Sequence, residues 1–179
     1  MSIHIMENMN INENESLVQL KELIPSVDLN KVFDFTIKNL GFDNLSNEKI
    51  IEILKDGRVF SHFIEHWLSM TFGLIHISGC KDHDFTDPNN SEIFYDQKTF
   101  TKGGCRFMPS SMIGTGRIFN QSDFEKKANK LIYCIVSNIN FPEIKIIFIR
   151  GSDLITKYPL GTITNVMRPS QKPSLIFFN

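Results

Sequence analysis

The sequence predicts one α/β domain in which helices cover the faces of a mixed β-sheet. Apolar residues recur at helical spacing through the first third of the chain, and short runs rich in β-branched residues follow after residue 73. The predicted order is helices, two strands, one helix and then further strands, which is typical of such a layered fold. The chain has 179 residues without internal repeats or a linker, so we expect a single domain.

The helices expected in the first third are recognised by their apolar spacing and by the residues at their ends. They cover residues 16–24, 29–40, 47–55 and 58–72. Gly41 suits the position after the second of them. Ser46 suits the N-cap of the third, and Gly73 follows the fourth. We therefore expect residues 1–55 to form a helical N-terminal region and residues 56–179 to form the core.

The strands expected after residue 73 are separated by polar or glycine-rich segments. They cover residues 74–78, 91–101, 131–139, 144–150 and 174–178. Residues 103–116 contain four glycines and one proline, so we expect a loop there. Two more helices are expected, one over residues 122–130 with Ser122 as its N-cap and a shorter one over residues 151–159.

Composition and cysteine usage exclude several classes of protein. Hydrophobic residues make up 41% of the chain and charged residues 22%, which argues for a globular protein and against disorder. No apolar run approaches the roughly 18 residues of a membrane span, and residues 1–16 lack the pattern of a secretory signal. The three cysteines are widely spaced and form neither a disulfide framework nor a zinc knuckle. We expect reduced thiols, a cytoplasmic location and no membrane partner.

The chemistry indicated by the sequence lies around the predicted strand at residues 91–101. Asp96 and Lys98 are two residues apart, so their side chains share one face of a strand. Such a buried acid and base are costly unless they are paired or bind a metal. Asp84 precedes a turn that can fold it back beside Asp96. Two carboxylates in this arrangement predict a Mg²⁺ site, beside which Lys98 can position water or neutralise developing charge.

This segment resembles the PD-(D/E)xK nuclease superfamily, and more narrowly the PvuII-type restriction endonucleases. The resemblance covers residues 60–105 and depends on Gly73-Leu74, Gly79, Asp84, Asp87, Asp96-Gln97-Lys98 and Thr101-Lys102-Gly103. The family order of a helix, three strands, a helix and a strand extends it to residue 138. The sequence departs from the pattern at His83, where the family has proline, and at Asp96, where glutamate is commoner.

The resemblance implies a restriction-endonuclease-like fold and Mg²⁺-dependent hydrolysis of phosphodiester bonds. Asp84 and Asp96 would be the metal ligands, and Lys98 would be the catalytic lysine. Glu65 lies on the helix before the sheet, which in some members supplies a further acid, so it is a candidate accessory residue together with Asp87. The narrower resemblance implies a type II restriction endonuclease that cuts double-stranded DNA at a short specific site.

Binding of double-stranded DNA requires a positively charged protein surface, and a palindromic site favours a protein with two-fold symmetry. The net charge is −1, but residues 98–130 contain seven cations and two anions, and such a local basic region can attract phosphate. The residues expected to contact DNA are Lys102, Arg106, Ser110, Ser111 and Arg117. Because a palindromic site matches a two-fold dimer, we expect a homodimer, with residues 1–55 as a candidate interface.

Three alternatives remain open. A repair or junction nuclease of the same fold would use the same three site residues. His62, Glu65 and His66 form an H-x-x-E-H sequence, the inverted zinc-peptidase motif, for which Glu143 could be a third zinc ligand. The chain could also be a DNA-binding module without catalytic activity.

Overall fold

The main element of the fold is a mixed β-sheet. The computed structural model describes residues 23–38, 40–41, 43–79 and 82–164, and within these residues the sheet has six strands. Their order across the sheet is β1 (Val32–Thr36), β7 (Glu143–Arg150), β6 (Leu131–Ser137), β4 (Phe94–Phe100), β3 (Phe85–Thr86) and β2 (Ile75–His76). A separate two-stranded sheet joins β5 (Cys105–Arg106) to β8 (Thr162–Ile163).

β4 and β6 form the centre of the sheet and run parallel to each other, whereas the other neighbouring strands are antiparallel. A parallel pair needs a crossover connection, which here contains α4 (Gln121–Ala128). All seven residues of β6 are buried, as expected of a strand that is covered on both faces. The prediction of an α/β domain with a mixed sheet flanked by helices is therefore confirmed.

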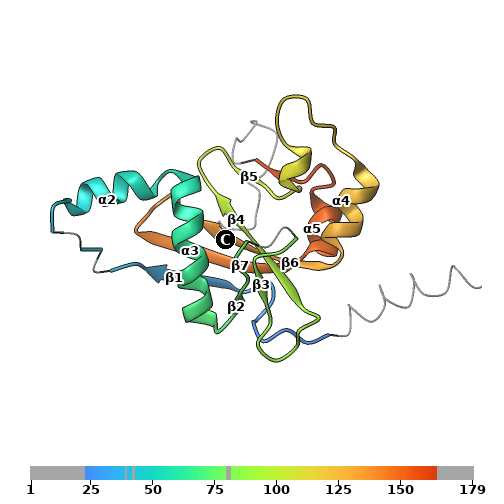
Figure 1. Ribbon diagram of the computed structural model, residues 1–179, viewed down its shortest axis with the longest axis horizontal. Coiled ribbons are helices and arrows are strands. Elements are labelled where there is room, and N and C mark those ends of the chain that lie inside the picture. Colours follow the sequence, from blue (N-terminus) through green and yellow to red (C-terminus); the bar gives the residue numbers. More distant parts are fainter. Residues whose placement is uncertain (1–22, 39, 42, 80–81, 165–179) are drawn as a thin grey trace, which may run out of the picture.

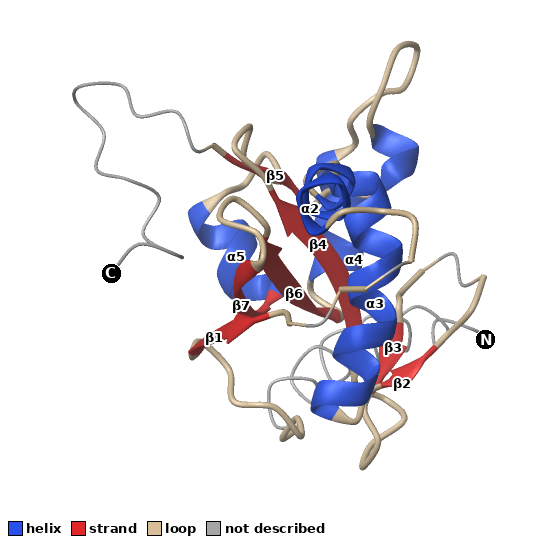
Figure 2. Cartoon of the chain, turned by 90° about the vertical axis from the view of Figure 1, so that its left-hand side faces the viewer, coloured by secondary structure: helices blue, strands red, loops and turns tan. Residues whose placement is uncertain are grey.

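The two faces of the sheet carry different helices. α2 (Asn47–Leu54) and α3 (Gly57–Phe72) share one hydrophobic core with Tyr95 of β4. α4 and α5 (Gly151–Lys157) share a second core with Phe94 and Phe100 of the same strand. Figure 1 shows α3 lying across the sheet, and Figure 2 shows α3 and α5 on either side of its strands. Alternate residues of β4 therefore face different cores.

The ends of the helices follow local rules that the sequence only partly reveals. Ser46 caps α2 by accepting a hydrogen bond from the backbone N–H of Lys49 at 3.3 Å, as predicted. Gly73 ends α3 in the left-handed region at φ 69°, which glycine adopts without steric cost. The N-cap of α4 is Asn120, which accepts from Asp123 N, so the prediction of Ser122 was wrong by two residues.

The helix predicted over residues 29–40 is wrong, because Val32–Thr36 forms the edge strand β1. Its burial alternates with a period of two. Phe33 lies 5.2 Å from Phe72 and Phe35 lies 5.0 Å from Trp67 between ring centroids, and both partners belong to α3. Aromatic residues alternate with exposed residues in this segment, and this pattern favours a strand rather than a helix. Gly41 consequently does not follow a helix, and the described part of residues 1–55 is not a purely helical region.

Three short strands were not predicted from the sequence. β3 lies in the segment expected to be a polar turn, β5 lies in the segment expected to be a loop, and β8 follows α5. The remaining predicted strands are observed as β2, β4, β6 and β7. The predictions for residues 16–22 and 174–178 lie outside the described residues. Within the described residues, no helix combines the length and apolar character required to cross a bilayer.

Candidate active site

Asp96 and Lys98 form an ion pair on one face of β4. Lys98 Nζ lies 2.6 Å from Asp96 Oδ2. Both side chains leave the strand on the face of Phe94 and Phe100, because residues two apart in a strand share a face. Asp96 is only 8% exposed, whereas Lys98 is partly exposed. The structure therefore brings the two residues together as the alternation of the sequence predicts, with the lysine nearer to solvent.

Asp84 lies opposite this pair, at the point where the β3–β4 ladder ends. Asp84 N donates to Tyr95 O at 2.9 Å, and Phe85 pairs with Tyr95 in the antiparallel register. Continuation of this register places Asp84 across from Asp96. Because Phe85 and Tyr95 both face the α3 core, Asp84 and Asp96 face the other side of the sheet together.

The carboxylate of Asp84 is held by the backbone of β4. Gln97 N donates to Asp84 Oδ2 at 2.6 Å, so a side-chain oxygen replaces the backbone carbonyl that a longer β3 would have offered. A hydrogen bond to an ionised carboxylate is stronger than one between neutral groups. Asp84 is therefore fixed through one oxygen, in a partly exposed position beside a second acid.

Burial and neighbouring charges set the ionisation of the pair. Burial raises the pKa of Asp96, and the negative charge of Asp84 raises it further, while Lys98 and Lys127 act in the opposite direction. Burial by itself would lower the pKa of Lys98, but the adjacent Asp96 more than offsets this and leaves the pKa raised. Lys98 is therefore a cation, and two acids converge on it in a poorly solvated place.

Cys105 and Tyr133, two residues beside the pair, are neutral. Burial raises the pKa of Cys105 in β5 to about 12, so this thiol is protonated near neutrality. Tyr133 pairs with Asp96 in the parallel register, and burial raises the pKa of its hydroxyl as well. Charges interact more strongly where few solvent or polar groups screen them. The charges of Asp84, Asp96 and Lys98 therefore dominate this part of the sheet.

The donor set determines which metals the site can take. Among the described residues there is no group of three or more histidine, cysteine, aspartate or glutamate side chains arranged to hold a metal ion. A closed zinc site needs about four protein ligands, whereas Mg²⁺ is often held by only one or two carboxylates and retains water or phosphate as further ligands. Asp84 and Asp96 fit the second requirement.

Glu65 and Asp87, the two candidate accessory acids, lie in other surroundings. Glu65 Oε1 lies 3.2 Å from Ser61 Oγ, and Glu65 Oε2 lies 3.5 Å from His76 Nε2. Ser61 has a single hydroxyl proton, and its shorter contact, 2.9 Å, is the one to Gln97 Oε1 on the face of β4 opposite Asp96. Asp87 is 1% exposed and accepts four hydrogen bonds, from Ser26 N and Oγ, Tyr95 Oη and Asn89 N. Asp87 thus ties the β3–β4 turn to residues near the start of the described chain.

The H-x-x-E-H residues do not assemble as a zinc-peptidase site. His62 and His66 are exposed on α3, and the nearest ring to His66 among the described contacts is His76, at 4.9 Å between centroids. Glu143 begins β7 and pairs with Thr36. In the part of the chain that the structure describes, these side chains form no metal-ligating group.

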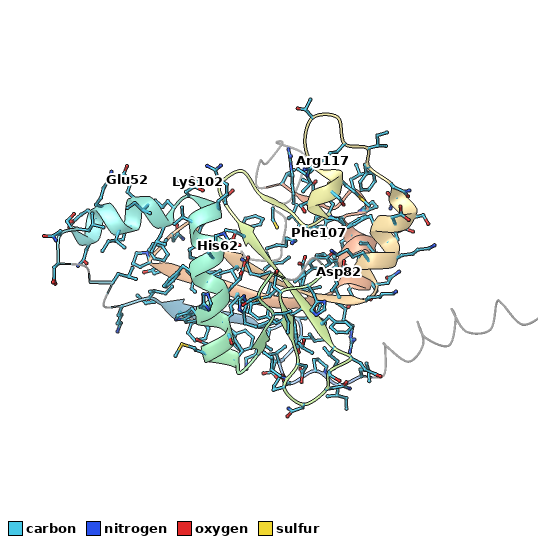
Figure 3. All side chains as sticks on the ribbon, viewed as in Figure 1. Glu52, His62, Asp82, Lys102, Phe107 and Arg117 are labelled. Atoms are coloured by element: carbon cyan, nitrogen blue, oxygen red, sulfur yellow. The ribbon has the colours of Figure 1, made fainter. Side chains whose placement is uncertain are left out.

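The residues expected to contact DNA lie between β4 and α4. Arg106 is exposed on β5, and Ser110 and Ser111 begin a 3-10 turn. Arg117 Nη1 donates to the carbonyl of Ser110 and, at 3.0 Å, to that of Ile113, so its guanidinium also closes its own loop. Figure 3 shows Arg117 and Lys102 toward the same side of the molecule.

Sequence reasoning missed two residues next to the pair. Lys127 is one of the seven cations of residues 98–130, and it is half-buried and close enough to Asp96 to influence the pKa of that carboxyl. Its position three residues after the buried Phe124 is the pattern that could have indicated an inward-facing lysine. The sequence does not indicate Gln97, because the middle residue of an acid-x-Lys sequence faces away from the pair.

Comparison with known proteins adds no relative. Neither a protein-family model, nor a curated protein, nor a solved structure matches this chain.

Proposed function

We propose that the protein is a Mg²⁺-dependent nuclease, specifically a type II restriction endonuclease that hydrolyses phosphodiester bonds in double-stranded DNA at a short site. One observation carries the proposal. Asp84 lies opposite Asp96 across two strands, and Lys98 lies on the same face with its ammonium 2.6 Å from Asp96. Two converging carboxylates beside a lysine are the groups that hydrolysis of a phosphodiester with a bound divalent ion requires.

The order of elements supports the finer assignment to a restriction-endonuclease-like fold. α3, β2, β3, β4, α4 and β6 occur in this order as a helix, three strands, a helix and a strand, with the short β5 and a 3-10 turn between β4 and α4. This is the order implied by the family resemblance. Asp84 precedes the second of those strands, and Asp96 and Lys98 lie on the third.

Each site residue has a separate role in the proposed reaction. Asp84 and Asp96 would hold Mg²⁺ through carboxylate oxygens. A bound Mg²⁺ would supply Lewis acidity toward the phosphate and lower the pKa of a coordinated water. Lys98 is protonated next to Asp96 and would neutralise the negative charge that develops on the attacked phosphate. Lys127 adds a second positive charge from α4.

The DNA partner and the dimer belong to the same proposal. Lys102, Arg106 and Arg117 extend the positive charge from the site along the segment before α4. A homodimer would place one such site on each strand of a palindromic sequence. Three exposed apolar residues around α2 and the start of α3, in or next to the expected interface, support an association there: Leu45, Ile53 and Val59.

Digestion of a mapped plasmid tests the proposal. Purified protein is incubated with plasmid DNA in Mg²⁺ and in EDTA, with Lys98→Ala purified in parallel to exclude a contaminating nuclease. Discrete fragments that need Mg²⁺ and are absent with Lys98→Ala are expected. A Mg²⁺-dependent smear would favour a repair or junction nuclease of the same fold. Intact plasmid in all samples, with binding retained, would favour a non-catalytic DNA-binding module.

A further inference from the structure

Gln97 connects the two faces of β4. It stands between Asp96 and Lys98 in the sequence, and its side chain is 4% exposed on the opposite face of the strand. There Ser61 Oγ donates to Gln97 Oε1 at 2.9 Å, and Gln97 Nε2 donates to Thr99 Oγ1 at 3.1 Å. Its backbone N–H donates to Asp84 Oδ2 at 2.6 Å. One residue is therefore bonded to α3 on one side and to a site carboxylate on the other.

The side chain of Gln97 is held in place by hydrogen bonds to its buried amide. It lies beside the α3 core, where a buried amide is costly unless its oxygen and nitrogen find partners. Ser61 and Thr99 supply both partners. Because a hydroxyl both donates and accepts, the contact with Ser61 holds for either orientation of the amide. Release of Gln97 from Ser61 would leave a polar group unpaired in the interior, so the pair is fixed together.

The backbone N–H of Gln97 also has a specific partner, the carboxylate of Asp84. β3 begins at Phe85, so the ladder offers no further strand carbonyl to the N–H of Gln97. Asp84 Oδ2 takes that place, which commits one carboxylate oxygen and leaves Oδ1 as the second. The direction of the Asp84 carboxylate consequently depends on where the N–H of Gln97 lies.

We propose that Gln97 and Ser61 are positioning residues of the nuclease site. Ser61 on α3 holds the Gln97 side chain, and the Gln97 N–H orients the carboxylate of Asp84 so that its other oxygen is available to a divalent cation. This inference rests on the proposed function, because it assigns Asp84 to the metal. Neither residue touches the substrate, and both act through Asp84.

Ser61→Ala and Gln97→Leu test the inference, with Ser69→Ala as a matched control. Ser69 is also a partly buried serine of α3, but its hydroxyl donates to Leu74 O at 2.6 Å, near the helix end remote from Gln97. Mn²⁺ serves as the probe, titrated into the full chain without DNA and followed by electron paramagnetic resonance. Cleavage with Mg²⁺ gives kcat and KM, and thermal melts report stability.

Groups that orient a metal ligand typically contribute about 10–100-fold to metal affinity or activity. We therefore expect Ser61→Ala and Gln97→Leu to weaken Mn²⁺ binding and lower kcat by about 10-fold or more, with KM for DNA little changed. Ser61→Thr keeps a hydroxyl and should restore both values. Ser69→Ala should lower the melting temperature without changing Mn²⁺ affinity.

The outcomes separate this inference from the proposed function. Wild-type Mn²⁺ affinity and kcat in folded Ser61→Ala and Gln97→Leu would overturn the positioning role while leaving the nuclease intact. Equal losses of Mn²⁺ affinity in Ser61→Ala and Ser69→Ala would also overturn it, because the effect would then be general loosening of α3. A wild-type chain that neither binds Mn²⁺ nor cuts DNA would overturn the proposed function and this inference with it.

Discussion

Asp84 and Asp87 lie three residues apart in one hairpin and have opposite surroundings. Asp87 is almost fully buried and accepts four hydrogen bonds from neutral groups. Asp84 is partly exposed, accepts one backbone hydrogen bond from Gln97 and lies across from a second acid. A carboxylate surrounded by neutral donors has little capacity left for a ligand, whereas two converging carboxylates repel each other until a cation binds. The hairpin thus separates Asp87, which stabilises the fold, from Asp84, for which we propose a role in the chemistry.

The largest expected effect is the loss of cleavage when Asp84 or one of its two neighbours in the proposed site is replaced. Asp84→Ala, Asp96→Asn and Lys98→Ala should each lower kcat by on the order of 10²–10³-fold or more, because each removes a group that acts at the scissile phosphate in the proposed reaction. Circular dichroism should show an intact fold for all three. Near wild-type cleavage by a folded Lys98→Ala or Asp96→Asn protein would show that the site lies elsewhere.

Asp84→Ala should also separate binding from cleavage. Without metal, the Asp84 carboxylate repels phosphate, so DNA binding in EDTA should survive or tighten when it is removed. The same assay on Asp87→Ala is the internal comparison. Retained cleavage by Asp84→Ala together with a folded but inactive Asp87→Ala would transfer the metal site from the first acid to the second.

Asp87→Ala should mainly reduce stability. Loss of this carboxylate leaves the buried Tyr95 hydroxyl without its acceptor, which costs about 1–3 kcal/mol, whereas the exposed Ser26 can bond to water instead. We therefore expect a loss of about 1–3 kcal/mol in the free energy of unfolding, measured by urea denaturation. Asp28→Ala is a suitable control, because its ion pair with Lys31 is exposed and should contribute little.

The role of Asp87 also predicts how stability depends on pH. Burial opposes ionisation of Asp87, but hydrogen bonds from Tyr95, Ser26 and Asn89 outweigh it and lower its pKa below the ordinary 3.8. A carboxyl with a lowered folded-state pKa stabilises the fold above its unfolded-state pKa, and this stabilisation is lost as the pH falls through the folded-state pKa. The difference in melting temperature between wild type and Asp87→Asn should therefore be constant above about pH 5 and shrink below it. A difference that grows in acid would contradict this assignment.

The same comparison explains what could be predicted from the sequence. Asp96 and Lys98 share a face because side chains alternate along a strand, and the turn that follows Asp84 brings β4 back so that Asp96 lies opposite Asp84. Both features are local properties of the chain. The partner of Asp87 at Ser26 is 61 residues away, and that of Gln97 at Ser61 is 36 residues away. No spacing rule indicates such pairs. Their roles emerge only from the packing of α3 and the N-terminal segment against the sheet.

The error at residues 29–40 has a related cause. Val32, Phe33 and Phe35 fit the period of a helix as well as that of a strand in so short a window, and Gly41 suits the end of a helix, so the local pattern favours a helix. The structure pairs this segment with β7, more than 100 residues later, and packs Phe33 and Phe35 on α3. A strand that depends on such a distant partner is poorly determined by its local pattern.

A smaller effect is expected from the two arginines of the segment between β4 and α4. If Arg106 contacts a guanine edge, Arg106→Ala should cost roughly 1–3 kcal/mol and relax specificity at one base pair. Arg117, which follows Gly114 and Gly116 and is among the residues expected to contact DNA, also bonds to the carbonyls of its own loop. Arg117→Ala should therefore relax discrimination at more than one position. Competition against single-base variants of the cognate site measures both, and unchanged discrimination in both variants would place sequence reading elsewhere.

The smallest expected effect distinguishes Lys127 from its neighbour Lys126 on α4. Lys127 is half-buried and lowers the pKa of Asp96 from its position near the site, whereas Lys126 is exposed on the same helix. Lys127→Ala should slow cleavage several-fold, equivalent to about 1 kcal/mol, because one positive charge near the phosphate is lost. If Lys127 also contacts a phosphate of bound DNA, the dependence of log affinity on log salt should become shallower by about one unit. Lys126→Ala should leave the cleavage rate unchanged at saturating DNA. Identical rates and salt slopes for the two variants would show that α4 contributes only a diffuse positive charge and no residue directed at the site.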